Sequence, residues 1–264
     1  MCGLMGASGE LDLDVVRSLA CQNVKRGIDS AGIAYVNGHD HVVEKVAQHP
    51  LVAFNTTLSK GMIRATASGV MLAHTRQATT GDVTNENAHP FLMGDIAFAH
   101  NGIILNYKKF GKYKVDSQSL IHGIKRRNFS KYTGPIALVW LEKGLLHAYR
   151  RGNPLTRGVK GHAVYVASEA LFLQRVGCRN IHELVEGTVY TFKDGKIHHT
   201  QNVPSNKVWE YQTADVATSH QSFENEWLYN NGQKAKFYRP GHGLIDNAEA
   251  YLRDQEKNTP MDLL

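Results

Sequence analysis

The sequence has few cysteines and no long hydrophobic run, and each shortage excludes a class of protein. Its 264 residues include three cysteines, Cys2, Cys21 and Cys178, and no two of them are spaced as zinc ligands. An odd count without close pairing argues against a disulfide framework and favours a reducing compartment. No apolar stretch approaches the roughly 20 residues that cross a bilayer, and the N-terminus lacks the regions of a signal peptide. We expect a cytoplasmic protein without metal, cofactor or membrane segment.

The composition is that of a folded globular protein with moderate positive charge. Hydrophobic residues make up 42% of the chain and charged residues 20%, with a formal net charge of +6. The densest basic run, Lys125-Arg126-Arg127, follows the apolar pair Leu120-Ile121, which is typical of the solvated end of a helix. The charge therefore permits a nucleic-acid partner without favouring one.

Cys2 is the first candidate for chemistry. Removal of Met1 would make it the N-terminal residue, with a thiol and a free α-amine on one residue. A free α-amine has a pKa of about 7.7–8.0, so a sizeable fraction is unprotonated near neutral pH. Such an amine can take the thiol proton and later return it to a leaving group. A cysteine at position 2 is more often an ordinary small residue, so the rest of the chain has to support this role.

Apolar periodicity predicts many strands and few helices. Helical spacing covers 11–25, 51–62 and 117–126. Short apolar runs bounded by turn residues predict strands, and these are 4–8, 33–36, 41–46, 71–74, 96–100, 136–141, 145–149, 163–168, 189–192 and 196–198. The pattern alone indicates an α+β protein.

Three polar segments adjoin these elements. Residues 75–81 read as a loop after a buried strand, and residues 26–32 lie between a helix and a strand. Asn101-Gly102 follows the strand 96–100 and is either a turn or a pair of donors, side-chain amide and backbone N–H, for an oxyanion. Arg26 and Asp29 are either turn residues or members of a site.

Several motifs in order resemble the class II glutamine amidotransferase domain, a branch of the N-terminal nucleophile hydrolases. They are Cys2-Gly3, RGIDSAG at 26–32, AHTRQATTG at 73–81, NAHP at 87–90, HNGII at 100–104, VDSQSLI at 115–121, RRGNPL at 150–155, YVASE at 165–169 and EGTVYTFKDGKI at 186–197. Among members of the family, the chain is most similar to the glutaminase domain of glucosamine-6-phosphate synthase. The resemblance implies a four-layer αββα sandwich.

The resemblance also implies a role for each matching residue. Cys2 would be the nucleophile, Arg26 would lie beside it, and Asn101 with Gly102 would stabilise the oxyanion. In the substrate pocket, Arg76 would hold the α-carboxylate of glutamine and Asp116 its α-ammonium, with Thr79 as a further contact. A zwitterion needs one fixed cation and one fixed anion, which this pair supplies.

Two positions depart from the synthase pattern. Gln77 replaces an aromatic residue and Thr80 replaces a histidine, both on the loop expected to close over glutamine. With these two departures, the resemblance does not predict how the loop closes or how closure is coupled to an acceptor. We expect His74 and His89 to be structural residues that form hydrogen bonds, and Cys21 to be a buried structural thiol.

The domain boundary is expected near residue 200. Residues 2–200 would form the amidotransferase domain, and residues 201–264, which are polar with isolated aromatics such as Trp209 and Trp227, an extension that packs on it or contacts a partner. The extension is too short for an acceptor-binding synthase domain.

The resemblance therefore implies that the chain hydrolyses L-glutamine to glutamate and ammonia through a γ-glutamyl thioester on Cys2, and passes the ammonia to a separate acceptor enzyme. One alternative is an amidohydrolase of the same fold acting on another γ-glutamyl amide, although the pair Arg76 and Asp116 favours a free amino acid. The other is a non-catalytic binding subunit, for which the basic pI allows a nucleic-acid partner.

Overall fold

The computed structural model describes residues 2–78, 82–205, 237–239 and 243–245. The chain divides into two compact units, Met1–Trp209 and Glu210–Leu264. In the second unit, β14 (Phe237–Arg239) pairs antiparallel with β15 (Gly243–Ile245). The predicted packing of the tail aromatics, including Trp227, falls outside the described residues.

Within the described part of the first unit, the strands form two antiparallel sheets. The first sheet has the order β11-β9-β10-β1-β4-β2-β3. Its strands are β1 (Gly3–Gly9), β2 (Ser30–Asn37), β3 (Asp40–Val46), β4 (Val70–Arg76), β9 (Thr156–Lys160), β10 (Ala163–Ala167) and β11 (Arg179–Glu183). The second sheet has the order β13-β12-β8-β7-β6-β5. Its strands are β5 (Phe91–Met93), β6 (Ile96–Gly102), β7 (Ile136–Glu142), β8 (Leu145–Arg151), β12 (Thr188–Lys193) and β13 (Lys196–Asn202).

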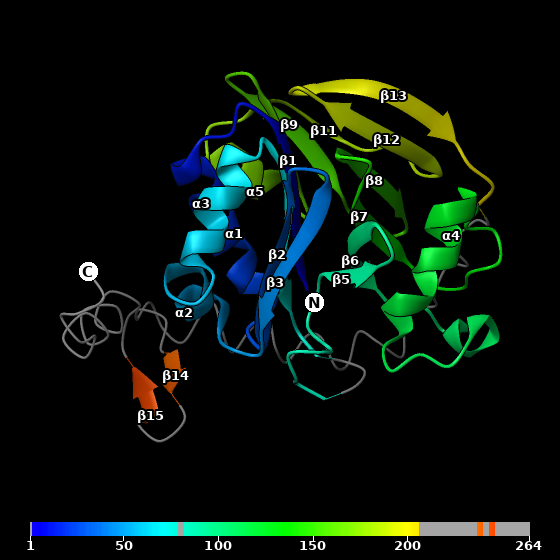
Figure 1. The fold of residues 1–264 in the computed structure, drawn as a ribbon, viewed down its shortest axis with the longest axis horizontal. Helices are drawn as coiled ribbons and strands as arrows, with labels where there is room; N and C mark the ends of the chain where they lie inside the picture. Colours follow the sequence, from blue (N-terminus) through cyan, green and yellow to red (C-terminus); the bar gives the residue numbers. More distant parts are fainter. Residues whose placement is uncertain (1, 79–81, 206–236, 240–242, 246–264) are drawn as a thin grey trace, which may run out of the picture. The chain divides into compact units, whose positions relative to one another are not determined.

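Helices cover the outer faces of both sheets. On the first sheet lie α1 (Leu13–Asn23), α2 (Pro50–Asn55), α3 (Ser59–Ala67) and α5 (Ala170–Arg175), and α4 (Ile121–Arg126) lies beyond the second sheet (Figure 1). Asp12 caps α1, because its side chain accepts the N–H groups of Asp14 and Val15. Of three short 3₁₀ turns in the described residues, η1 (Val24–Arg26) follows α1, η3 (Asp116–Leu120) precedes α4, and η2 (Tyr107–Phe110) lies between β6 and η3.

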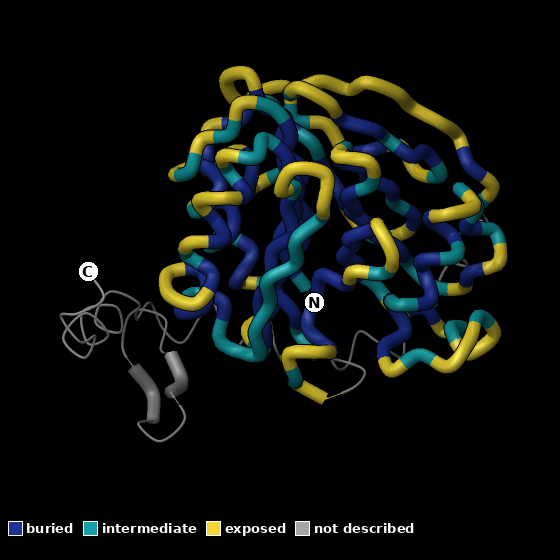
Figure 2. The backbone as a smooth tube through the Cα atoms, in the orientation of Figure 1, coloured by how far each residue is buried: buried dark blue, intermediate teal, exposed yellow. Residues whose placement is uncertain are grey.

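Three hydrophobic clusters join the four layers. Strand β1 shows how alternation creates them, since Met5 and Ala7 pack against the helices of the first sheet, whereas Leu4 packs in the cluster between the sheets. A third cluster, including Trp140 and Ile124, joins the second sheet to α4. Figure 2 shows the strands buried in the interior and β13 exposed along an edge. The architecture is the predicted four-layer αββα sandwich of α+β class.

The central position of β1 determines where Cys2 lies. Strand β1 pairs with β10 on one side and β4 on the other, with Gly3 opposite Thr75 and Met5 opposite Ala167. The beginning of β1 therefore meets the ends of β4 and β10. Cys2 directly precedes β1, so side chains from all three strand ends can surround it.

Several predicted elements differ in their limits. The helix predicted at 51–62 is two helices, because the side chains of Asn55 and Thr56 bond to the carbonyls of Leu51 and Val52 and end α2. Strand β4 continues to Arg76, which the sequence placed in a loop. The helix predicted at 117–126 begins as the 3₁₀ turn η3. Strands β5, β9 and β11 and helix α5 were not predicted.

Candidate active site

The sulfur of Cys2 lies against the residue that follows β4. Its Sγ accepts the N–H of Gln77 at 3.3 Å and approaches the Gln77 carbonyl oxygen at 3.5 Å. Burial raises the pKa of the Cys2 thiol, while the Gln77 hydrogen bond and the charges of Arg76 and Arg26 oppose that rise. With its pKa raised, the thiol is mainly protonated at neutral pH. It therefore needs a base before it can act as a nucleophile.

Two side chains hold the backbone carbonyl oxygen of Cys2. Arg26, at the end of η1, donates its Nε–H to this oxygen at 2.8 Å, and Asn101 donates from Nδ2 at 2.7 Å. Arg26 also forms an ion pair with Glu169. These contacts fix the position of Cys2 before any substrate is bound.

Asn101 is the centre of a buried hydrogen-bond network. Its Oδ1 accepts from His74 Nε2 at 3.0 Å, and Nδ2 donates to Ser168 Oγ at 3.0 Å in addition to the Cys2 oxygen. Burial lowers the pKa of His74 to about 3, so the ring is neutral and Nε2 carries its proton. Asn153 supports the same residue by donating from Nδ2 to the Asn101 carbonyl oxygen at 2.9 Å. The amide is therefore held rigidly.

Gly102 ends β6 where a side chain has no room. Its φ is 143°, and an added Cβ would lie 2.0 Å from the Pro135 carbonyl oxygen and 2.6 Å from His100 Nε2. Asn101 and Gly102 pair with Ala137 and Ile136 as the last residues of the strand. The alternative that Asn-Gly is a hairpin turn is therefore wrong.

Arg76 is the last residue of β4 and is 3% exposed. Its Nη1 donates to the Asp82 carbonyl oxygen at 3.1 Å. The adjoining Gln77 donates from Nε2 to Asp29 Oδ2 at 3.1 Å, and Ala78 N–H donates to the same oxygen at 2.7 Å. Asp29 thus anchors the chain on the way into the predicted closing loop. Thr79 and Thr80 lie outside the described residues.

Asp116, the first residue of η3, is joined to the segment after Gly102. Its Oδ2 accepts the N–H of Ile104 at 2.7 Å, and the side chain is buried. Ser117 Oγ lies 3.5 Å from Asp116 Oδ1 and 2.9 Å from His100 Nδ1. The carboxylate charge therefore lies close to the end of β6.

Comparisons with known proteins show which family the chain is similar to. Residues 1–116 match the class-II glutamine amidotransferases. A glutamine–fructose-6-phosphate aminotransferase (isomerizing) of Legionella pneumophila is 26% identical over 286 residues, which cover 96% of this chain and 45% of that protein. The Thermotoga maritima protein of that name is 30% identical over 244 residues, 77% of this chain and 38% of that protein. Residues 1–116 are therefore similar to a class-II glutamine amidotransferase domain.

The fold agrees with that of a solved structure. Glutamine phosphoribosylpyrophosphate (PRPP) amidotransferase from B. subtilis, complexed with ADP and GMP, superimposes with a TM-score of 0.64 at 22% identity, over 78% of this chain and 50% of that chain. The predicted N-terminal nucleophile hydrolase fold is confirmed. The chain spans less than half the length of the two aminotransferases that it matches.

Sequence analysis gave no role to three residues that contact the site, Asn153, Ser168 and Glu169, and it left Asp29 open between a turn residue and a member of a site. All four occur in motifs that carried the resemblance to the amidotransferases, and Ser168-Glu169 are polar residues directly after a buried strand. Their position directly after a buried strand was the sequence signal that could have marked Ser168 and Glu169 as site residues.

The predictions for the remaining residues have mixed outcomes. His74 forms its hydrogen bond, but neither ring nitrogen of the buried His89 has a partner among the described residues, so that prediction is wrong. Cys21 is half-buried rather than buried. Arg127 does not point freely into solvent: it pairs with Glu142 and lies over the Trp140 ring.

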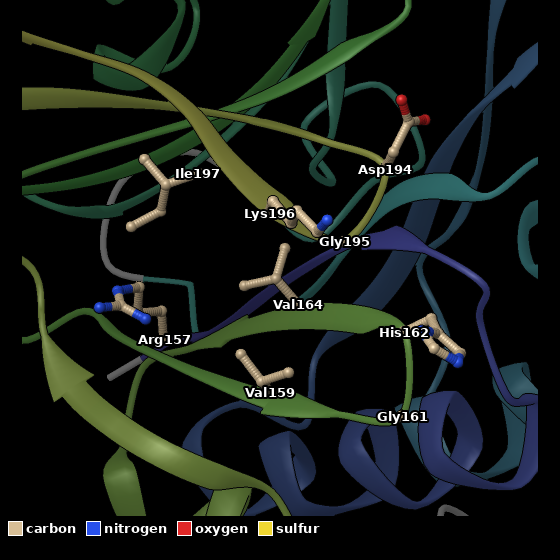
Figure 3. A pocket seen from close by; sticks show the side chains of 9 residues that line it. All are labelled: Arg157, Val159, Gly161, His162, Val164, Asp194, Gly195, Lys196 and Ile197. Atoms are coloured by element: carbon tan, nitrogen blue, oxygen red, sulfur yellow. The ribbon is translucent and has the colours of Figure 1, made fainter.

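Neither of two cavities at the far end of the sandwich contains a predicted site residue. One, of about 320 Å³, lies between β9, β10 and the β12–β13 hairpin, and Figure 3 shows Val159, Val164 and Ile197 around it. The second, of about 540 Å³, includes Ser8 and Gly9, the end of β1 opposite Cys2. Among the described residues, no group of three potential ligands is placed to hold a metal ion, and no helix has the length and apolarity to cross a membrane.

Proposed function

We propose that this chain hydrolyses L-glutamine to glutamate and ammonia through a γ-glutamyl thioester on Cys2, and that the ammonia passes to a separate acceptor enzyme. The observation that carries the proposal is the position of Cys2 at the start of the central strand. Its carbonyl is held by Arg26 and Asn101, and its sulfur lies against Gln77, directly after the buried Arg76. Similarity to the class-II glutamine amidotransferases supports the same chemistry.

The first half-reaction releases ammonia. Once Met1 is removed, the α-amine of Cys2 takes the thiol proton, which the raised pKa of the thiol makes necessary. The thiolate attacks the side-chain amide carbon, and the carbonyl electrons move to oxygen. Collapse of this tetrahedral intermediate breaks the C–N bond, and the protonated α-amine gives its proton to the leaving ammonia. The product on the enzyme is a thioester.

The second half-reaction restores the thiol. A water molecule loses a proton to the α-amine and attacks the thioester carbon. The C–S bond then breaks to release glutamate, and the protonated α-amine returns its proton to the departing sulfur. Gly102 N–H and the Asn101 amide would stabilise the oxyanion in both halves. Both Nδ2 protons of Asn101 already have acceptors, the Cys2 oxygen and Ser168 Oγ. Asn101 must therefore exchange or share one of these hydrogen bonds as the oxyanion forms.

Recognition of glutamine is assigned to two buried charges. Arg76 would bind the α-carboxylate through its planar guanidinium, and Asp116 the α-ammonium. Asp116 Oδ2 is already bonded to Ile104 N–H, which fixes the orientation of the carboxylate, and Oδ1, which accepts from Ser117 Oγ at 3.5 Å, has a second lone pair for the ligand. Thr79 remains a proposed further contact.

The proposed use of ammonia rests on the relatives, which are named as aminotransferases from glutamine to fructose 6-phosphate. A separate acceptor enzyme is tested by purifying the chain under native conditions and identifying co-purifying proteins. Stimulation of glutamine hydrolysis by such a protein together with its acceptor substrate would support the transfer. Hydrolysis that is indifferent to every co-purifying protein would contradict it.

Cys2→Ala tests the hydrolysis itself. We expect glutamate and ammonia formation to fall to background, while Cys21→Ala, which removes another half-buried thiol, keeps its activity. Intact mass should show loss of Met1 in the wild-type protein. A glutamine analogue with an electrophile at the amide position should add one equivalent to Cys2. Unchanged turnover in Cys2→Ala would refute the proposal. If the wild-type protein hydrolyses another γ-glutamyl amide faster than glutamine, that amide and not glutamine is the substrate.

A further inference from the structure

The two donors that hold the Cys2 carbonyl are themselves held by two consecutive residues. Asn101 donates its second Nδ2 proton to Ser168, and Arg26 forms its ion pair with Glu169. We infer that Ser168 and Glu169, directly after β10, are positioning residues that fix the nucleophile through Asn101 and Arg26. The inference rests on the proposed function and assigns roles that the family match does not give.

Ser168 ties the strand that follows the nucleophile to the amide of Asn101. Its Oγ accepts the N–H of Leu4 at 2.9 Å as well as the Asn101 proton, and its backbone N–H donates to the Leu4 carbonyl oxygen at 3.0 Å. The residue is 0% exposed. One hydroxyl, directly after β10, therefore joins β1 to the end of β6.

Glu169 acts on the other donor. Arg26 is 10% exposed in its side chain and donates from Nε to the Cys2 oxygen, while a second guanidinium nitrogen reaches Glu169. A guanidinium is planar, so fixing one nitrogen fixes the direction of Nε–H. Loss of the carboxylate oxygen removes the ion pair that orients this end of the guanidinium, and the support that Arg26 gives to Cys2 weakens.

Loss of Ser168 or Glu169 should affect the turnover number rather than the binding of glutamine. Ser168 and Glu169 contact the supports of Cys2, whereas glutamine would be bound by Arg76 and Asp116. Misplacing a nucleophile by about 1 Å can cost about 100-fold in rate. We therefore expect kcat to fall while KM for glutamine changes little.

The test compares Glu169→Ala with Glu169→Gln. The amide oxygen of glutamine can still accept the Arg26 proton, so we expect kcat to fall about tenfold or more in Glu169→Ala and to recover to within about twofold in Glu169→Gln. KM should stay within about twofold in both. Glu142→Ala is the matched control, because it removes an ion pair with Arg127 far from Cys2. It should lower the melting temperature and leave kcat unchanged.

A second measurement needs no glutamine. The alkylation rate of the Cys2 thiolate by iodoacetamide, taken at its high-pH plateau, should rise about threefold or more when Cys2 is loosened in Glu169→Ala, and stay at the wild-type value in Glu169→Gln and Glu142→Ala. Ser168→Ala should behave as Glu169→Ala, but a fully buried deletion can impair folding, so the Glu169 series decides. Wild-type kcat and alkylation values in Glu169→Ala overturn the inference. Absence of glutamine turnover in the wild type overturns the proposed function instead, and the alkylation series still tests the positioning.

Discussion

One carboxylate oxygen of Asp116 accepts the N–H of Ile104, and this bond separates the role of the residue in folding from its proposed role in recognition. Asp116→Asn keeps an oxygen for Ile104 and removes the negative charge. Leaving the partner of a buried charge unpaired costs about 2–5 kcal/mol. We therefore expect KM for glutamine to rise by about 30-fold or more, since 1.4 kcal/mol is a factor of ten.

The same variant offers a specificity measurement. Glutaramate has the side-chain amide and the carboxylate chain of glutamine but lacks the α-ammonium. Its kcat/KM should be the same in the wild type and in Asp116→Asn, whereas that of glutamine falls. Asp95→Asn, at an exposed carboxylate, serves as the control and should change neither substrate. An equal loss for glutamine and glutaramate would contradict the assignment of Asp116 to the ammonium group.

Individual residues differ in how far sequence could place them. Cys2, Arg26 and Asn101 stand in motifs with few chemical interpretations, so candidate roles could be written from the residue types. Glu169 could not be assigned, because its contact with Arg26 spans 143 positions and depends on β10 lying beside β1. The side chain of His89 was misjudged for a related reason: burial was predictable, but the lack of a partner was not.

Strand β6 ends at a backbone position that only glycine fits. Gly102→Ala combines a φ of 143° with a Cβ 2.0 Å from the Pro135 carbonyl oxygen. Strain at such a φ costs about 1–3 kcal/mol and overpacking about 1–3 kcal/mol more. We expect the free energy of unfolding, measured by urea denaturation, to fall by about 3 kcal/mol or more.

Gly144→Ala provides the comparison for strain without a clash. Gly144 has a φ of 72° in the β7–β8 turn, and nothing lies within 4 Å of an added Cβ. We therefore expect Gly144→Ala to lower the free energy of unfolding by only about 1–2 kcal/mol. Equal losses for the two variants would mean that the close approach of Pro135 to Gly102 does not exist in solution.

Some boundaries of helices and strands follow from the local sequence, whereas others depend on pairing with a distant strand. Asp194-Gly195 and Lys143-Gly144 have positive φ at both residues, so their hairpins were predictable from turn chemistry. Arg76 was not predicted in a strand because a charged residue at a strand end resembles a loop residue. Pairing of Ser30 with Arg76 extends β4 to that point. The exposed strand β11 has little apolar alternation, and it exists because β9 offers a partner.

For the whole molecule, period-2 and period-3.6 patterns indicated an α+β protein but not how its elements stack. The layers stack because the central strands are apolar on both faces. In β1, for example, Leu4 and Met5 point to opposite faces and enter different clusters. Nothing in a single strand says which partner covers each face. The resemblance to a known family supplied the four layers.

Burial of neutral histidines throughout the sandwich makes its stability depend on pH. Burial lowers the pKa of His74 to about 3 and that of His147 to about 4, and it lowers the pKa values of His89 and His100 as well. The unfolded chain titrates near 6.5. Below that pH the unfolded state binds more protons than the folded state, so the free energy of unfolding falls as pH falls. Each histidine contributes up to about 1.4 kcal/mol per pH unit between 6.5 and its folded pKa.

His89→Leu isolates one of these contributions. The ring makes no hydrogen bond within the described residues and packs against His74 and Phe91, so a leucine of similar size removes two buried polar atoms without leaving a partner unpaired. We expect the unfolding free energy at pH 7.5 to stay equal or rise, and its decline between pH 6 and pH 5 to become smaller by about 1 kcal/mol. His162→Gln, at an exposed position, should keep the wild-type slope in the same urea titrations. An unchanged slope in His89→Leu would mean that His89 is protonated to the same extent in the folded and unfolded chains, which is incompatible with a buried ring that has no hydrogen-bond partner among the described residues.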